Sequence, residues 1–187
     1  MKRISLFIMT ICLVIPLIGY DNNKQASLEG YKDSDIAAIV GDKEITIGEL
    51  RFLNADQDVL SRIDDAVRVE LMIQEAKKMN LDLSDKIDSM KKAVATTSLD
   101  DIEMEKSERE FIKSQARKLG MKTDENFKEY LEITSERSLY IMEYTQKAFR
   151  ELVPFNGEEL AVYNEELDEF LDELVNEQQN EIKILIK

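Results

Sequence analysis

Two short apolar runs, each rich in β-branched residues, lie far apart in a chain whose intervening sequence has helical periodicity. Residues 36–40 have the sequence IAAIV, and after a Gly-Asp turn residues 43–46 continue as a second β-type run. Residues 182–187 have the sequence IKILIK, in which apolar and basic side chains largely alternate. A short strand can neither satisfy its backbone hydrogen bonds nor bury its apolar face alone. We therefore expect the two distant runs to pair, which predicts a mainly α fold with a small β element formed by the N- and C-terminal strands.

The segment after the first run carries the signals of amphipathic helices. Thr46 and Glu49 have the spacing of a capping box, which predicts a helix that begins near Ile47. A second helix is expected over residues 58–79, because its apolar residues recur on one stripe and Asn80 tolerates the left-handed conformation that ends many helices. The stripe consists of Leu60, Ile63, Val67 and Leu71.

Three further helices are expected in the second half of the chain. Ser98 is placed to cap a helix over residues 99–119. A long helix is expected over 123–152, ended by Pro154, and an acidic helix over 157–180. The apolar side chains of the long helix cover about twice the arc of roughly 100° that a surface helix needs. We therefore expect this helix to contact more than one neighbouring element or to line a groove.

The first twenty residues have the pattern of an export segment. Lys2 and Arg3 precede an uncharged apolar run at 4–19, which predicts a signal peptide or a membrane anchor over residues 1–20. The end of that run resembles the start of a bacterial lipobox, but Tyr20 stands where the acylated Cys would be. Retention on the membrane and release after cleavage both stay open. In either case we expect the remaining chain to be extracytoplasmic, on the outer face of the bacterial cytoplasmic membrane if it is retained.

Composition narrows the function of the exported part. Residues 21–35 are polar and predict a flexible tether, followed by a helical domain over 36–187. Lys2 and Arg3 are two of the 25 basic residues, so residues from 21 onwards carry 23 basic against 39 acidic side chains, a net charge of −16. This charge argues against nucleic acid as a partner. The chain has no His and a single Cys, at position 12, so we expect no cofactor, no metal site and no His-based catalysis.

Four segments, in order along the chain, match the pattern of one family. They are residues 40–46 (VGDKEIT) followed by Glu49-Leu50, residues 68–83 (RVELMIQEAKKMNLDL), residues 119–125 (LGMKTDE) and residues 183–186 (KILI). Together they resemble the SurA/PrsA-type N-terminal domain, the chaperone module of bacterial extracytoplasmic foldases. The resemblance implies a helical domain that binds unfolded or partly folded polypeptides. Many members also carry a parvulin-type prolyl isomerase domain, for which this chain has neither room nor the active-site His, so we do not expect isomerase activity.

Five side chains are candidates for a peptide-binding surface. Met104 and Met142 lie amid charged or aromatic neighbours, and thioethers adapt to varied partners. Tyr130, Tyr140 and Tyr144 lie on one side of the expected long helix, where they could stack on an extended peptide. Packing is the alternative for all five, with methionines filling gaps between helices and tyrosines sealing the joint with the first helices.

Two functions are compatible with these observations. The first is an extracytoplasmic chaperone-like domain that binds unfolded or partly folded polypeptides in an apolar groove without catalysis. The second is an envelope adaptor or structural protein that uses the same fold to bind one dedicated partner. Recovery of many clients with the protein would favour the first function, and recovery of one stoichiometric partner would favour the second.

Overall fold

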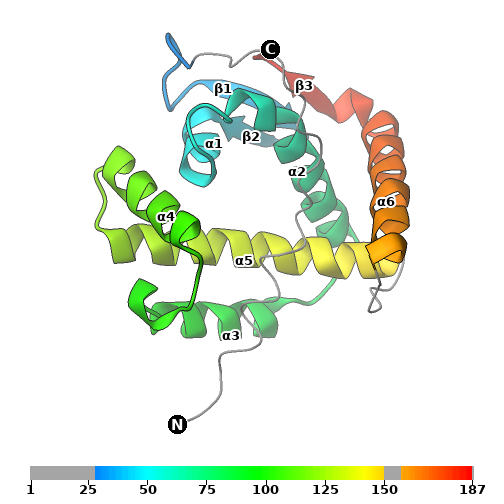
Figure 1. The fold of residues 1–187 in the computed structure, drawn as a ribbon. Coiled ribbons are helices and arrows are strands. Elements are labelled where there is room, and N and C mark those ends of the chain that lie inside the picture. Colours follow the sequence, from blue (N-terminus) through cyan, green and yellow to red (C-terminus); the bar gives the residue numbers. More distant parts are fainter. Residues whose placement is uncertain (1–27, 150–156, 187) are drawn as a thin grey trace.

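The computed structural model describes residues 28–149 and 157–186, and this part of the chain is mainly helical with a small antiparallel sheet, as predicted (Figure 1). The elements are β1 (Ile36–Val40), β2 (Lys43–Thr46), α1 (Ile47–Leu53), α2 (Ile63–Lys78), α3 (Ser84–Ala95), α4 (Lys106–Leu119), α5 (Thr123–Ala148), α6 (Gly157–Glu177) and β3 (Ile182–Ile184). Short 3-10 turns lie at Leu60–Arg62, Leu99–Asp101 and Gln179–Glu181. The expected export segment at 1–20, the first part of the tether and Pro154 lie outside the described residues.

The two distant apolar runs pair in the sheet, which confirms the expectation from the sequence. The strand order is β2-β1-β3, and β1 is antiparallel to both neighbours. Val40 pairs with Lys43 across the hairpin and with Ile182 of β3. At the hairpin, Gly41 has φ +57°, a left-handed conformation that favours glycine. Its N–H donates to the carbonyl of Glu181 at 2.8 Å, so the hairpin also holds the entry to β3.

The local signals around α1 and α2 act as the sequence predicts. The Thr46 hydroxyl accepts from the Glu49 N–H at 3.1 Å, and the Glu49 carboxylate accepts from the Thr46 N–H at 3.1 Å. Asn80 follows α2 with φ 52°, the expected left-handed conformation. The predicted start of α2 was early, because residues 60–62 form a 3-10 turn and the α-helix begins at Ile63.

The predicted helix over 99–119 is wrong in its first third. Ser98 does cap, but it caps the 3-10 turn at Leu99–Asp101. The α-helix begins at Lys106, where the Glu108 carboxylate accepts from the Glu105 N–H at 3.1 Å. The intervening loop is held by Arg109, which donates to the Asp100 carboxylate and to the Ile102 carbonyl. Periodicity alone predicts a single helix here. Two separate acidic capping signals instead start a short turn and then the α-helix.

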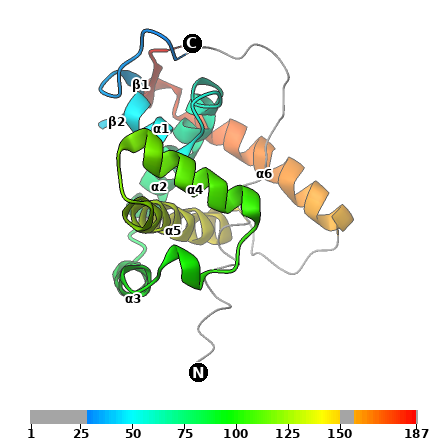
Figure 2. The same cartoon turned by 60° about the vertical axis from the view of Figure 1, so that its left-hand side comes forward.

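Helix α5 connects two separate clusters of buried side chains. The larger cluster combines the sheet, α1, α2, α6 and the C-terminal part of α5. The smaller cluster is formed by α3, the turn at Leu99–Asp101, α4 and the N-terminal part of α5. In Figures 1 and 2, α3 lies along one side of α5, whereas α4 lies on another. The wide apolar arc of α5 is explained by these contacts, and the expectation of more than one partner element is confirmed.

Helix α4 also caps the C-terminal end of α1. Gln115 is 3% exposed, and its side-chain amide donates to the carbonyls of Arg51, Phe52 and Asn54 at 2.8–3.2 Å. Lys118 donates to the Asp56 carboxylate at 3.0 Å and to two of the same carbonyls. Burial raises the pKa of Asp56, but hydrogen bonds from Arg51 and Lys118 outweigh burial and bring that pKa below its ordinary value. This junction fixes α4 against α1.

Candidate functional site

Met104 and Tyr130 lie together in the smaller cluster. Both are half-buried, and both pack against its buried core. The Tyr130 ring lies 6.0 Å from the ring of Phe111, at an interplanar angle of 69°. This edge-to-face arrangement is ordinary aromatic packing. Met104 and Tyr130 therefore have a structural role in the smaller cluster, whereas their role in peptide binding stays a prediction.

The other three predicted residues lie on the far half of α5. Tyr144 is 4% exposed and belongs to the larger cluster, where its ring lies 6.0 Å from that of Phe170. Tyr140 is half-buried, and the Lys77 ammonium lies 5.3 Å from its ring centroid. Met142 is half-buried and belongs to neither cluster. A peptide could reach Tyr144 only after the larger cluster repacked.

The five predicted residues do not belong to one cluster. Tyr130 and Tyr144 are fourteen positions apart on one helix, which corresponds to about 21 Å along its axis. They also belong to different clusters. Tyr140 and Tyr144 pack with the larger cluster, which contains the first helices, whereas Tyr130 packs with α3 and α4 in the smaller cluster. A role of the tyrosines in peptide binding stays a prediction. Any site that includes all five would have to extend along most of α5.

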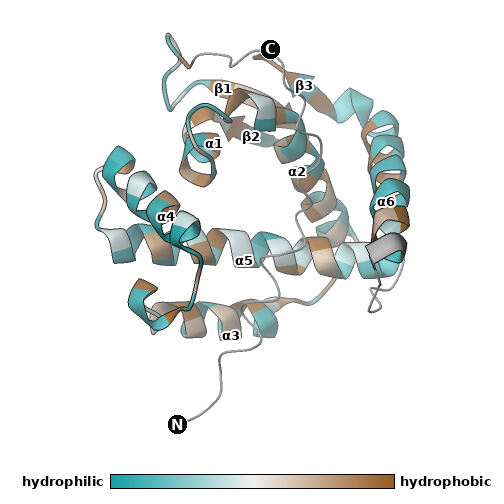
Figure 3. Ribbon diagram, in the orientation of Figure 1, coloured by the Kyte–Doolittle hydropathy of each residue, from teal (hydrophilic) through white to brown (hydrophobic). Residues whose placement is uncertain are grey.

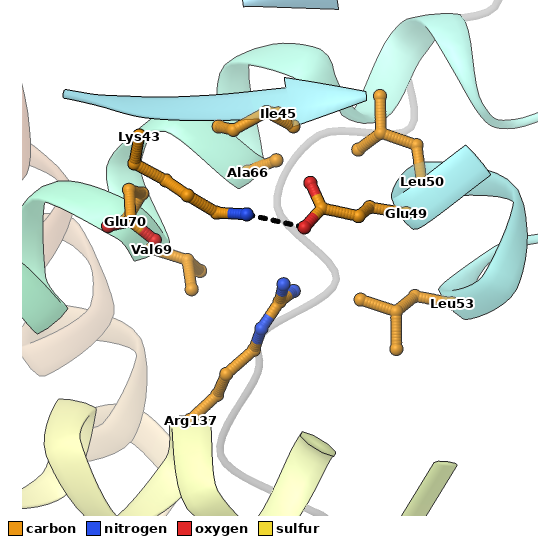
Figure 4. A pocket seen from close by; sticks show the side chains of 9 residues that line it. All are labelled: Lys43, Ile45, Glu49, Leu50, Leu53, Ala66, Val69, Glu70 and Arg137. Carbon is orange, nitrogen blue, oxygen red and sulfur yellow. Dashed lines mark hydrogen bonds and ion pairs between the residues drawn. The ribbon is translucent and has the colours of Figure 1, made fainter. Parts of the chain in front are cut away.

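A hollow that the sequence did not predict lies between β2, α1, α2 and α5 (Figure 4). It encloses about 300 Å³ of empty space, part of which is open to solvent. Its lining consists of Lys43, Ile45, Glu49, Leu50, Leu53, Ala66, Val69, Glu70 and Arg137. Of the apolar members, Ile45 and Leu50 are buried, while Leu53, Ala66 and Val69 remain half-buried. In Figure 3, parts of the α1 and α2 ribbons are coloured hydrophobic, whereas much of the α6 ribbon is coloured hydrophilic.

Arg137 rises from α5 into the hollow, and its guanidinium points toward the Lys43–Glu49 ion pair (Figure 4). Within residues 28–149 and 157–186, the side chain of Arg137 makes no hydrogen bond and no ion pair. Burial lowers the pKa of Arg137, and the negative charges of Glu49 and Glu70 only partly offset this effect. The hollow thus holds a partly desolvated cation whose five donors are unused by the surrounding chain.

The two nearby carboxylates are already engaged elsewhere. One oxygen of Glu49 accepts from the Lys43 ammonium at 2.5 Å, and the other accepts from the Thr46 N–H. Glu70 accepts from the side-chain amide of Gln74 at 2.9 Å. The capping box that begins α1 therefore also positions Glu49 beside Lys43, and Glu49 makes no hydrogen bond to Arg137.

Sequence reasoning missed Arg137, although a signal for it exists. Arg137 lies four positions after Ile133 and three before Tyr140, so it interrupts the apolar arc of α5 with a charge. A charged side chain on an otherwise apolar face indicates a buried partner or a binding site. The other residues that line the hollow lie about seventy or more positions earlier in the chain, so no local sequence pattern relates them to Arg137.

No family model, curated protein or solved structure matches this chain. The resemblance to the SurA/PrsA-type domain therefore rests on the four quoted segments and stays an expectation. Among the described helices, none is long and apolar enough to cross a membrane. The same residues contain no group of three or more acidic or thiol side chains placed to hold a metal ion.

Proposed function

We propose that this chain is an extracytoplasmic chaperone-like protein that binds unfolded or partly folded polypeptides without catalysis. Residues 1–20 would either hold it at the outer face of the cytoplasmic membrane or be removed. The observation that carries the proposal is the hollow between β2, α1, α2 and α5, in which Leu53, Ala66 and Val69 stay partly exposed. This site would take apolar side chains of a client by non-directional burial, which needs no nucleotide.

The rigid frame around the hollow supports this proposal. Its walls come from three helices and a strand that share one core, and the junction at Gln115 fixes the end of α1. A frame held in this way loses little conformational freedom when a client binds, which keeps the entropic cost of binding low. Burial of one apolar side chain contributes about 1.5–3 kcal/mol. Contacts of this strength are weak and reversible, which suits a protein that must release its clients without an energy source.

The acidic surface also supports the proposal. A net charge of −16 on residues 21 onwards keeps a complex with an aggregation-prone client in solution by electrostatic repulsion between complexes. The same charge favours clients with basic segments and disfavours attachment to anionic surfaces. The hollow and the acidic exterior thus have separate roles: the hollow binds the client, and the exterior keeps the complex soluble.

Aggregation of a client protein tests this function. We expect the full chain to suppress aggregation of a reduced, unfolding client, and we expect Leu53→Gln to weaken suppression several-fold because it places an amide in the apolar wall. The matched control is Leu160→Gln, because Leu160 is 47% exposed on α6, outside the hollow. Light scattering measures the aggregation, and circular dichroism verifies that both variants fold.

Three results would argue against the proposal. If the full chain leaves client aggregation unchanged at equimolar and higher ratios, the chaperone function is wrong. If co-purification returns one stoichiometric partner instead of a range of clients, the adaptor function replaces it. Equal activity of Leu53→Gln and Leu160→Gln would show that clients bind somewhere other than the hollow.

A further inference from the structure

We propose that the hollow binds the C-terminal end of a polypeptide whose last residue is apolar, with Arg137 as the residue that binds the terminal carboxylate. This inference rests on the proposed function and names the part of the client that the hollow takes. It follows from two properties of the hollow: the unused donors of Arg137 and the chemistry of the walls.

The donors of Arg137 are suited to a carboxylate. A guanidinium presents its N–H groups as a planar fork, which matches the two oxygens of a carboxylate. The two carboxylates nearest to Arg137 are held by other donors: Glu49 by Lys43 and Thr46, and Glu70 by Gln74. An incoming carboxylate would therefore meet donors that no described residue occupies.

Partial burial strengthens this interaction. Arg137 has lost part of its hydration, as the lowered pKa of its guanidinium indicates. A carboxylate that binds it would replace the lost water with charge-assisted hydrogen bonds in a site of reduced dielectric constant. The carboxylates of Glu49 and Glu70 weaken the attraction by repulsion, but Lys43 neutralises the first of them.

The walls of the hollow favour a chain end over an internal segment. Leu53 and Val69 flank the guanidinium (Figure 4). A ligand that contacts both the walls and the guanidinium therefore needs an apolar group and a carboxylate within the span of one residue. A C-terminal apolar residue carries both groups, whereas a glutamate side chain carries the carboxylate with no apolar branch.

Binding of short peptides to the full chain tests the inference. We compare a fluorescent pentapeptide that ends in leucine with a free carboxylate, the same peptide with a C-terminal amide, and an amidated peptide with glutamate as its last residue. The free carboxylate is expected to bind about tenfold or more tightly than the leucine amide, since hydrogen bonds to charged groups have this strength. Arg137→Met should remove the difference, and Arg137→Lys should retain part of it.

Arg117→Met is the matched control, because Arg117 is exposed on α4 and its guanidinium bonds within its own helix. It should leave the preference unchanged. Equal affinity for carboxylate and amide, or a preference that survives Arg137→Met in a folded protein, would overturn the inference. So would binding of the glutamate amide as tight as that of the free terminus. In these cases the aggregation assay still reports on the proposed function, so the two can fail separately.

Discussion

Replacement of Phe127 by alanine is expected to lower the free energy of unfolding by about 3–5 kcal/mol, the usual range for a buried phenylalanine. Phe127 is 1% exposed and is the largest buried side chain of the smaller cluster, where the other buried members are Val94, Leu99, Ile112 and Leu131. A cluster this small has few side chains that can move into the cavity, so we expect the loss to lie toward the upper end of this range. Urea unfolding measures it.

Phe111→Ala is the control for this substitution. Phe111 belongs to the same cluster but is half-buried, so its truncation should cost clearly less than that of Phe127. Hydrogen exchange should show that Phe127→Ala reduces protection in α3 and α4 more than in the sheet, because only the former elements pack on the smaller cluster. A loss below about 1 kcal/mol, or equal loss of protection in both clusters, would contradict the division of the core by α5.

Replacement of Gln115 by leucine is expected to lower the free energy of unfolding by about 2–3 kcal/mol. Its side-chain amide serves three carbonyls at the end of α1, and leucine has a similar volume but no donor. Lys118 still reaches two of these carbonyls, whereas the Phe52 carbonyl loses the donor that Gln115 provides. A buried acceptor without a partner costs about 1–3 kcal/mol. Thermal and urea unfolding measure the change.

Gln178→Leu is the matched control for the junction. Gln178 is half-buried, and its side chain makes one long hydrogen bond, of 3.5 Å, to Glu75. Its replacement should therefore change the free energy of unfolding by less than about 0.5 kcal/mol. If Gln115→Leu is as mild as Gln178→Leu, the contact between α4 and α1 is not a structural support. The hollow would then lack a fixed wall on that side.

Much of the fold could be predicted because its signals are local. The capping box of Thr46 and Glu49, the left-handed Asn80 and the turn at Gly41 all report through neighbouring residues. The pairing of β1 with β3 is a long-range contact, yet the need of an isolated strand for a partner was sufficient to predict it. The start of α4 was missed because the helical periodicity continues through residues 99–105. The backbone conformation there is set instead by two separate groups of capping side chains.

The candidate site could not be predicted in the same way. The hollow combines residues 43–70 with Arg137, and no spacing rule relates these positions. Tyr140 and Tyr144 were predicted to bind peptide because they are aromatic. A tyrosine on an amphipathic helix, however, is as suited to a core as to a surface. The structure places Tyr144 in the larger cluster. Gln115 was also missed, because a glutamine that caps a distant helix has the same local sequence as one that faces solvent.

Site-specific photocrosslinking tests the central claim, that the hollow is where polypeptide binds. A benzophenone side chain would replace Leu53 in the wall of the hollow or, as the control, Leu160 on α6. The full chain would then be irradiated with an unfolded client and, separately, with the folded client. The account predicts strong crosslinks from position 53 to the unfolded client, few to the folded client, and few from position 160. Equal crosslinking from both positions, or none from position 53, would contradict it.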